Sequence, residues 1–111
     1  MGNIIVLNSS NFAEVTSTND KLVAVDFWAQ WCIPCRAVAP ALDKLANEYP
    51  DNLIVGKLNI DENQELSQSI GITSIPTILL YAGGKILEAL VGAHPYQHYK
   101  DIVERHIAGG A

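Results

Sequence analysis

Apolar runs rich in β-branched residues alternate along the chain with longer stretches in which apolar side chains recur at helical spacing. This alternation is typical of an α/β domain and not of a helical bundle or a β-sandwich. Residues 22–28 and 53–60 are nearly continuous apolar runs, which favour strands covered on both faces. We therefore expect these two strands to lie side by side and parallel in the middle of one sheet.

Shorter apolar segments predict the rest of the sheet. Residues 4–7 are the first candidate strand. Residues 77–81 and 85–91 form a predicted hairpin, because a turn with two adjacent glycines at 83–84 separates them. This last pair of strands is expected to be antiparallel.

The longest predicted helix begins just after Cys32 and stops at Pro50 and Asp51. Its apolar face is formed by Val38, Leu42, Leu45 and Tyr49. Pro40 lies inside this helix, where it cannot donate a hydrogen bond to the carbonyl of Arg36. The sequence therefore predicts a kink one turn beyond the cysteines. A complete break at Pro40 is the alternative.

Three shorter helices are predicted on the same grounds. The first contains Phe12 and Val15, and the second covers about residues 64–69 and ends at Gly71. The third starts at Pro95, a residue favoured at the first helical position. The last residues, 108–111, are expected to fray.

Length and charge limit the classes of function. The chain has 111 residues and a net charge of -5, so we expect a single domain over residues 1–111 that binds neither nucleic acid nor an anionic membrane. No apolar stretch approaches the roughly 20 residues of a membrane helix, and the first residues do not resemble a secretion signal. We therefore expect a cytoplasmic protein, and a monomer is the simplest assembly.

The candidate chemistry lies at Cys32 and Cys35, which stand three positions apart at the start of a helix. Their α-carbons should be roughly 5 to 6 Å apart, a distance that a disulfide can bridge. Cys32 lies at the amino end, where backbone amides and the helix dipole favour a negative sulfur. We expect Cys32 to attack a substrate disulfide and Cys35 to resolve the resulting mixed disulfide. Pro34 between them suits an early helical position.

A cysteine pair with this spacing has other possible uses. Half of a zinc site is disfavoured because a second thiolate pair is absent and the histidines at 94, 98 and 106 fall near the far end of the chain. Two inert buried thiols, or a cysteine–histidine hydrolase, are further alternatives. The redox interpretation is favoured because the pair follows a predicted strand and opens a helix.

A series of short motifs is spaced over nearly the whole chain. They are Val25-Asp26-Phe27-Trp28-Ala29, Trp31-Cys32, Pro34-Cys35, Pro40, Lys57-Leu58-Asn59-Ile60-Asp61, Ser74-Ile75-Pro76-Thr77, Gly83-Gly84-Lys85 and Val91-Gly92-Ala93. From residue 4 to about residue 107, these motifs and the order of the segments resemble the thioredoxin family. The resemblance implies a thioredoxin fold, which is a central mixed five-stranded sheet flanked by four helices. It also implies a protein dithiol–disulfide oxidoreductase.

Asp26 stands out because an acid within an apolar run is costly to bury as an anion. A strand-end aspartate that reaches water is the alternative at this stage. The resemblance implies that Asp26 lies beneath the cysteines and handles protons for Cys35, with Lys57 as its charged neighbour. Both are therefore candidate catalytic residues.

The resemblance also implies a cis bond between Ile75 and Pro76, although base rates alone favour trans. A cis bond would expose the backbone at Ser74 for pairing with an extended substrate. The predicted docking surface consists of Trp31, Ile33, Pro34, Ser74, Ile75, Pro76, Gly92 and Ala93. Trp28 is interpreted as a core aromatic residue, and a core role is also the alternative for Trp31.

Some positions depart from the family pattern. Ile33 stands where glycine is common and Arg36 where lysine is usual, while His94 and Tyr96 are unexpected after the Gly92-Ala93 turn. Residues between the cysteines influence the balance between dithiol and disulfide. Because Ile33 is one of them, the sequence does not predict the redox potential.

By resemblance, the expected partners are a thioredoxin reductase, which passes on electrons from NADPH, and proteins that contain disulfides. No bound cofactor or metal is expected. A more oxidising oxidase or isomerase, and a binding or chaperone subunit that uses the same surface, stay open as alternatives.

Overall fold

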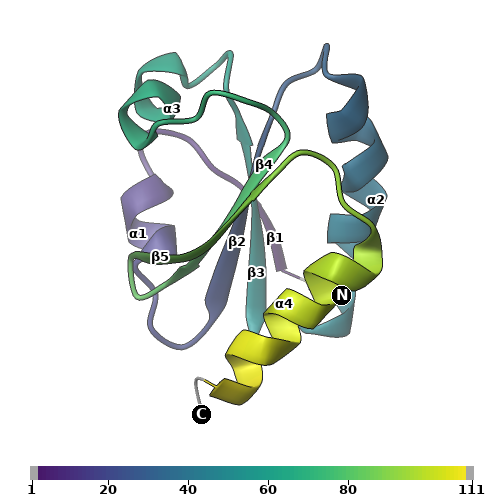
Figure 1. Cartoon of the computed structure of the whole chain (residues 1–111). Helices are drawn as coiled ribbons and strands as arrows, with labels where there is room; N and C mark the ends of the chain where they lie inside the picture. The colour runs from purple at the N-terminus through teal and green to yellow at the C-terminus, as the bar shows by residue number, and fades with distance from the viewer. Residues whose placement is uncertain (1–2, 110–111) are drawn as a thin grey trace.

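A mixed sheet with helices on both faces forms the frame of the protein (Figure 1). The computed structural model describes residues 3–109. Its elements in chain order are β1 (Asn3–Val6), α1 (Phe12–Thr16), β2 (Leu22–Trp28), α2 (Ile33–Glu48), β3 (Leu53–Asn59), α3 (Gln64–Ile70), β4 (Thr77–Ala82), β5 (Lys85–Val91) and α4 (Tyr96–Gly109). The predicted α/β class, with its five strands and four helices, is confirmed over these residues.

The strand order of the sheet is β1-β3-β2-β4-β5. The first three strands in this order run parallel, whereas β4 is antiparallel to both β2 and β5. The prediction that β2 and β3 lie side by side and parallel is confirmed, and so is the antiparallel hairpin of β4 and β5. In the parallel register, Asp26 of β2 lies opposite Lys57 of β3.

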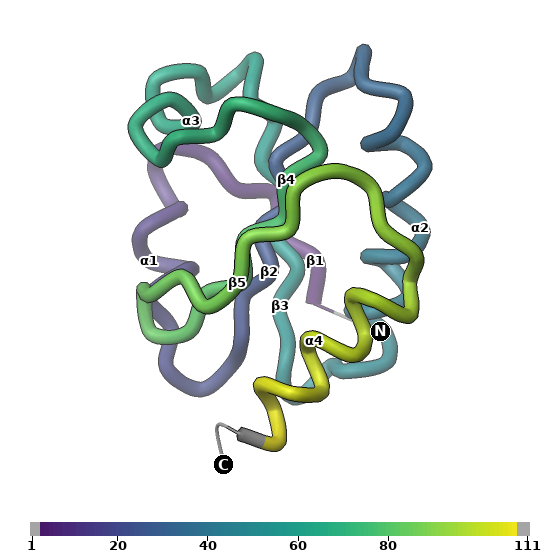
Figure 2. The backbone as a smooth tube through the Cα atoms, viewed as in Figure 1, coloured from purple at the N-terminus to yellow at the C-terminus, as the bar shows by residue number. Residues whose placement is uncertain are grey.

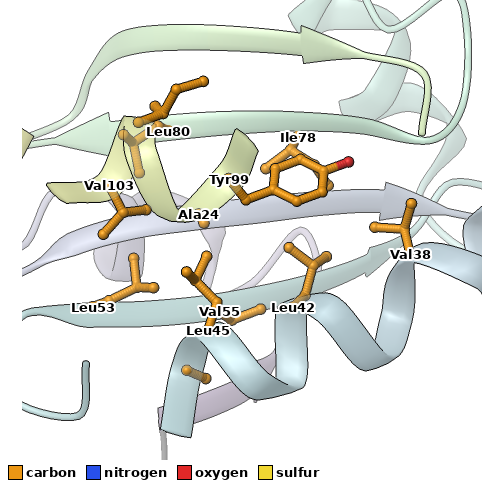
Figure 3. Close-up of a cluster of buried hydrophobic side chains, with 12 residues drawn as sticks. Ala24, Val38, Leu42, Leu45, Leu53, Val55, Ile78, Leu80, Tyr99 and Val103 are labelled. Atoms are coloured by element: carbon orange, nitrogen blue, oxygen red, sulfur yellow. The ribbon is translucent and has the colours of Figure 1, made fainter. Parts of the chain in front are cut away.

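One core lies between the sheet and the helices α2 and α4 (Figure 3). Leu42 and Leu45 of α2 meet Val55 of β3, while Tyr99 of α4 covers the same face from the other helix. All four side chains are buried. Burial of a side chain of this size contributes about 1.5–3 kcal/mol relative to exposure, so this core holds α2 firmly on the sheet.

A second core lies on the opposite face, beneath α1 and α3 (Figure 1). Leu7, Phe27 and Leu58 are fully buried there. Gly56 of β3 is part of this packing, because a Cβ atom at that position would overlap the side chain of Leu7. The face is incompletely covered at β5, where Ile86 is 51% exposed and Val91 59% exposed.

The ends of the helices follow the sequence closely. The helix α2 continues through Pro40, so the predicted alternative of a complete break is wrong. Gly71 ends α3 with a φ of 96°, a left-handed conformation that glycine adopts without strain. The last helix begins one residue after Pro95.

The predicted frayed tail is only partly described. Ala108 lies within α4, which ends at Gly109, so these two positions are helical instead of frayed. Residues 110 and 111 lie outside the described residues. No helix within residues 3–109 combines the length and the apolar character needed to cross a bilayer.

Candidate active site

The two cysteines lie where the loop after β2 enters α2. Cys32 is the N-cap residue of α2, and Cys35 lies in the first turn. The two residues form a disulfide, with their Cα atoms 5.3 Å apart. The backbone N–H of Cys35 donates a hydrogen bond to Cys32 Sγ over 3.2 Å. The expected pairing of the two cysteines at the amino end of a helix is therefore confirmed.

Most of the disulfide is covered by protein. Cys32 is 4% exposed and Cys35 3% exposed, and both pack with Ala29 and the partly buried Ile75. Attack on a substrate disulfide requires access to Cys32, and only a small part of this residue reaches the surface. The exposed neighbours are Trp31 and Ile33, at 64% and 75%.

Asp26 is buried beneath the cysteines, with 2% of the residue exposed. The alternative that it reaches bulk water at the strand end is wrong. Lys57 Nζ lies 3.5 Å from Asp26 Oδ2, while Asp26 Oδ1 has no hydrogen-bond partner among the described residues. Burial raises the pKa of Asp26 to about 6, although the positive charge of Lys57 acts in the opposite direction. Asp26 can therefore exchange a proton near neutral pH.

A cavity of about 330 Å³ connects this carboxyl group with the second cysteine. Its lining consists of Val6, Asp26, Trp28, Cys35, Arg36, Ala39 and Lys57. Its lining is mainly apolar, and the Asp26 carboxyl group and Cys35 border the same space.

The Ile75-Pro76 bond is cis, as the resemblance implied. Pro76 is buried, and its carbonyl oxygen accepts a hydrogen bond from the backbone N–H of Gly92 over 2.8 Å. Gly92 has a φ of 87°, which favours glycine at this position. The loop before β4 and the loop after β5 are therefore fixed to each other. Ala93 follows as an exposed residue.

A hollow beside the disulfide, which we call the disulfide-side hollow, has a volume of about 330 Å³. It is lined by Trp31, Ile60, Ile72, Thr73, Ser74 and Ile75. Three predicted docking residues, Trp31, Ser74 and Ile75, are thus brought together. Ile33 and Pro34 are exposed at the start of α2 and do not line this hollow.

Trp31 is held in place by Asp61, because its indole Nε1 donates a hydrogen bond to Asp61 Oδ2 over 2.8 Å. None of the sequence patterns predicts a role for Asp61, or for Ile72 and Thr73 in the hollow. A signal for Asp61 existed, since it follows closely after the carboxyl end of a central parallel strand, where binding residues gather. Trp28 is partly buried against the cysteine cluster, in agreement with its predicted packing role.

The three histidines lie in and around α4. The rings of His94 and His98 are 4.7 Å apart, and His106 Nε2 lies 2.7 Å from Glu88 Oε2. Within residues 3–109, no three side chains of metal-ligating type form a group that could hold an ion. The cysteines are bonded to each other, which agrees with redox use and not with use as metal ligands.

A disulfide at the amino end of a helix, a buried acid beneath it and an apolar hollow beside it define a thiol–disulfide oxidoreductase. Comparison with known proteins gives the same class. The thioredoxin family model matches residues 3–105. This chain therefore belongs to the thioredoxin family, whose members reduce protein disulfides with a cysteine pair and need no bound cofactor.

The similarity extends over whole chains. A thioredoxin from Chlorobaculum thiosulfatiphilum is 40% identical over 106 residues, which are 96% of this chain and 98% of that protein. A thioredoxin from Buchnera aphidicola is 41% identical over 107 residues, covering 96% and 99%. The structure of a mutant thioredoxin from Halobacterium salinarum superposes with a TM-score of 0.84 at 34% identity, and the match covers 93% of this chain and 89% of that chain. The predicted thioredoxin fold is thus confirmed.

Proposed function

We propose that the reduced protein acts through a mixed disulfide at Cys32. The thiolate of Cys32 attacks one sulfur of a substrate disulfide, the substrate S–S bond breaks, and the departing sulfur takes up a proton. At the N-cap position, the backbone N–H of Cys35 points at this sulfur and stabilises its negative form. The N-cap position of Cys32 supports its assignment as the nucleophile.

We infer that Asp26 takes the proton of Cys35 in the second half of the reaction. The Cys35 thiolate then attacks Cys32 Sγ, the mixed disulfide breaks, and the second substrate sulfur leaves as a thiolate that is protonated. The protein is left with the Cys32–Cys35 disulfide. The shared cavity and the raised pKa of Asp26 support this role. Lys57 holds the carboxyl group and adjusts its pKa.

The substrate is proposed to dock beside the disulfide. We expect the backbone at Ser74, an exposed residue before the buried Pro76, to pair with an extended segment. The proposed docking surface consists of Trp31, Ile33, Pro34, Ser74, Ile75, Gly92 and Ala93, while the buried Pro76 holds the loop in its cis form. Ile33 adds an exposed apolar side chain next to Cys32, so it contributes to the choice of partner.

The proposed physiological setting follows from this chemistry. Each turnover oxidises the cysteine pair, so a thioredoxin reductase that uses NADPH is the proposed source of electrons. A monomer in the cytoplasm, maintaining the thiol balance of the cell, is the proposed working form. A chloroplast thioredoxin of Chlamydomonas reinhardtii, 43% identical over 101 residues, shows that relatives also work in an organelle.

The observation that carries the mechanism is the placement of Cys32 at the cap and Cys35 within the helix. The reduced Cys35→Ser variant should accumulate a covalent complex with a disulfide-containing target such as insulin, because the resolving thiol is gone. The complex should be visible on a gel without reductant and should disappear with dithiothreitol. Cys32→Ser is the matched control and should form none. A complex that forms with Cys32→Ser instead would reverse the two roles.

Three experiments separate this function from its alternatives. Insulin reduction with dithiothreitol, followed by the same assay with an NADPH-dependent reductase, tests the chemistry and the partner in turn. Equilibration with glutathione distinguishes a reductant from an oxidase or isomerase, since a strongly oxidising potential contradicts the reductant role. If cells keep the function of the protein after both cysteines are replaced by serine, the alternative of a binding or chaperone subunit is favoured.

A further inference from the structure

A second hollow lies on the same side of the sheet as α1 and α3, next to β5. It has a volume of about 260 Å³, and we call it the β5 groove. Its lining consists of Ile70, Gly71, Ile72, Thr73, Ser74, Thr77, Leu79, Ile86, Ala89 and Val91. None of these side chains carries a charge. The groove therefore favours an apolar side chain over a charged one, which would lose its hydration.

The β5 groove meets the disulfide-side hollow at residues 72–74, which line both. Thr73 and Ser74 are small, exposed residues at this junction. A polypeptide that leaves the disulfide across Ser74 is therefore led directly into the β5 groove. The lining of the groove includes Ile86, which lies in the first half of β5. Figure 2 shows the course of the chain from α3 through β4 to β5.

Two features of β5 leave this path open. Ile86 and Val91 are 51% and 59% exposed, although both are large apolar residues. Within the described sheet, β5 is an edge strand that pairs with β4 only. Exposed apolar side chains next to the open edge of a strand suit an extended chain, which can use backbone hydrogen bonds and insert alternate side chains.

We propose that the β5 groove binds the part of a substrate polypeptide that flanks its reacting cysteine. The occupant is an extended segment with an uncharged apolar side chain, which is anchored between Ile86 and the end of α3. This inference rests on the proposed function, because the segment is delivered by the chemistry at Cys32. The groove makes Ile86 a residue that determines substrate specificity, at a distance from the reacting sulfurs.

The test compares two isoleucines on opposite edges of the sheet. Ile86→Lys places a charge in the β5 groove, and Ile4→Lys places the same charge on β1, where Ile4 is 45% exposed. Each variant is assayed with insulin and with bis(2-hydroxyethyl) disulfide, a small uncharged substrate without flanking polypeptide. Ile86→Lys should raise the KM for insulin by about three- to tenfold. Its kcat and its rate with the small disulfide should be unchanged, and Ile4→Lys should resemble the unaltered protein in both assays.

An insulin KM for Ile86→Lys equal to that of Ile4→Lys overturns the proposal. If Ile86→Lys loses activity with both substrates, its fold is damaged and Ile86→Ser takes its place. An unchanged insulin KM for a folded Ile86→Ser then overturns the proposal. Failure of the proposed function looks different, because the unaltered protein would then reduce neither substrate.

Discussion

Asp26 and Lys57 face each other across two parallel strands, and Lys57 Nζ is 3.5 Å from one oxygen of the Asp26 carboxyl group. The other oxygen is buried without a hydrogen-bond partner in the part of the chain that is described. One ion pair is thus the main compensation for loss of hydration. Because the desolvation effect is the larger of the two, the pKa of Asp26 rises to about 6.

Asp26→Asn should slow insulin reduction near neutral pH. At pH 7 the unaltered carboxyl group is mostly ionised and can accept a proton from Cys35, whereas an amide cannot. We expect a rate roughly tenfold lower in the variant at pH 7. The difference should narrow below pH 6, as Asp26 becomes protonated in the unaltered protein. Equal rates from pH 6 to 8, with folding intact, would remove Asp26 from the mechanism.

The same residue should make stability depend on pH. Because the folded pKa of about 6 exceeds the ordinary 3.8, folding favours the proton, and the stability due to Asp26 is present below about pH 4. It is lost as the pH rises to 6. Relative to the unaltered protein, Asp26→Asn should therefore gain about 3 kcal/mol in unfolding free energy between pH 3.5 and pH 7.5.

Urea unfolding of the oxidised protein at both pH values measures this gain. Asp51→Asn is a suitable control, since Asp51 is exposed in the turn before β3. Its difference from the unaltered protein should be nearly the same at both pH values. A gain for Asp51→Asn as large as that for Asp26→Asn would show that burial of Asp26 is not the cause.

Lys57→Met should move the acidic limb of the pH–rate profile to higher pH. Lys57 lowers the pKa of Asp26, so its removal lets burial raise that pKa further. As a control, Lys44→Met removes one positive charge from α2 instead of β3 and should leave the profile in place. In the background of Asp26→Asn, Lys57→Met should produce no shift, because the titrating group is absent. A shift that persists there would assign the effect to another group.

Gly56→Ala should destabilise the protein by about 1–3 kcal/mol, because the new methyl group meets the side chain of Leu7. Leu7→Ala alone should cost about 2–5 kcal/mol through the cavity it leaves. The double variant should be more stable than the sum of the two losses implies, since each change makes room for the other. Thermal or urea unfolding of the four proteins measures this coupling. Strict additivity would contradict the predicted overlap.

The fold was largely predictable because local patterns and global packing agree. The apolar runs at β2 and β3 are buried on both faces, and the residues of α2 that recur at helical spacing form its core contacts. The helix boundaries were predictable to within a few residues from Gly71 and Pro95. Continuation of α2 through Pro40 was not certain from sequence, because packing of Leu42 and Leu45 offsets the cost of the proline.

The site was less predictable than the fold. The cysteine pair follows from its spacing, and the burial of Asp26 follows from its position in an apolar run. The near-complete covering of Cys32, the bond from Trp31 to Asp61 and the cavity beneath Cys35 depend on contacts between distant segments. The spacing of apolar residues within one segment does not predict such contacts. They arise only when loops from several strands meet at one edge of the sheet.

The acid, the nucleophile and the resolving thiol all lie within residues 26–35, at the end of β2 and the start of α2. The surfaces proposed to receive substrates come mainly from residues 60–93, in separate loops and in β5. Reactivity and most of the proposed selectivity are therefore encoded in different stretches of the gene, with Trp31, Ile33 and Pro34 as the exceptions. Exchange of the later stretch offers a way to redirect the protein to new targets while its electron chemistry is retained.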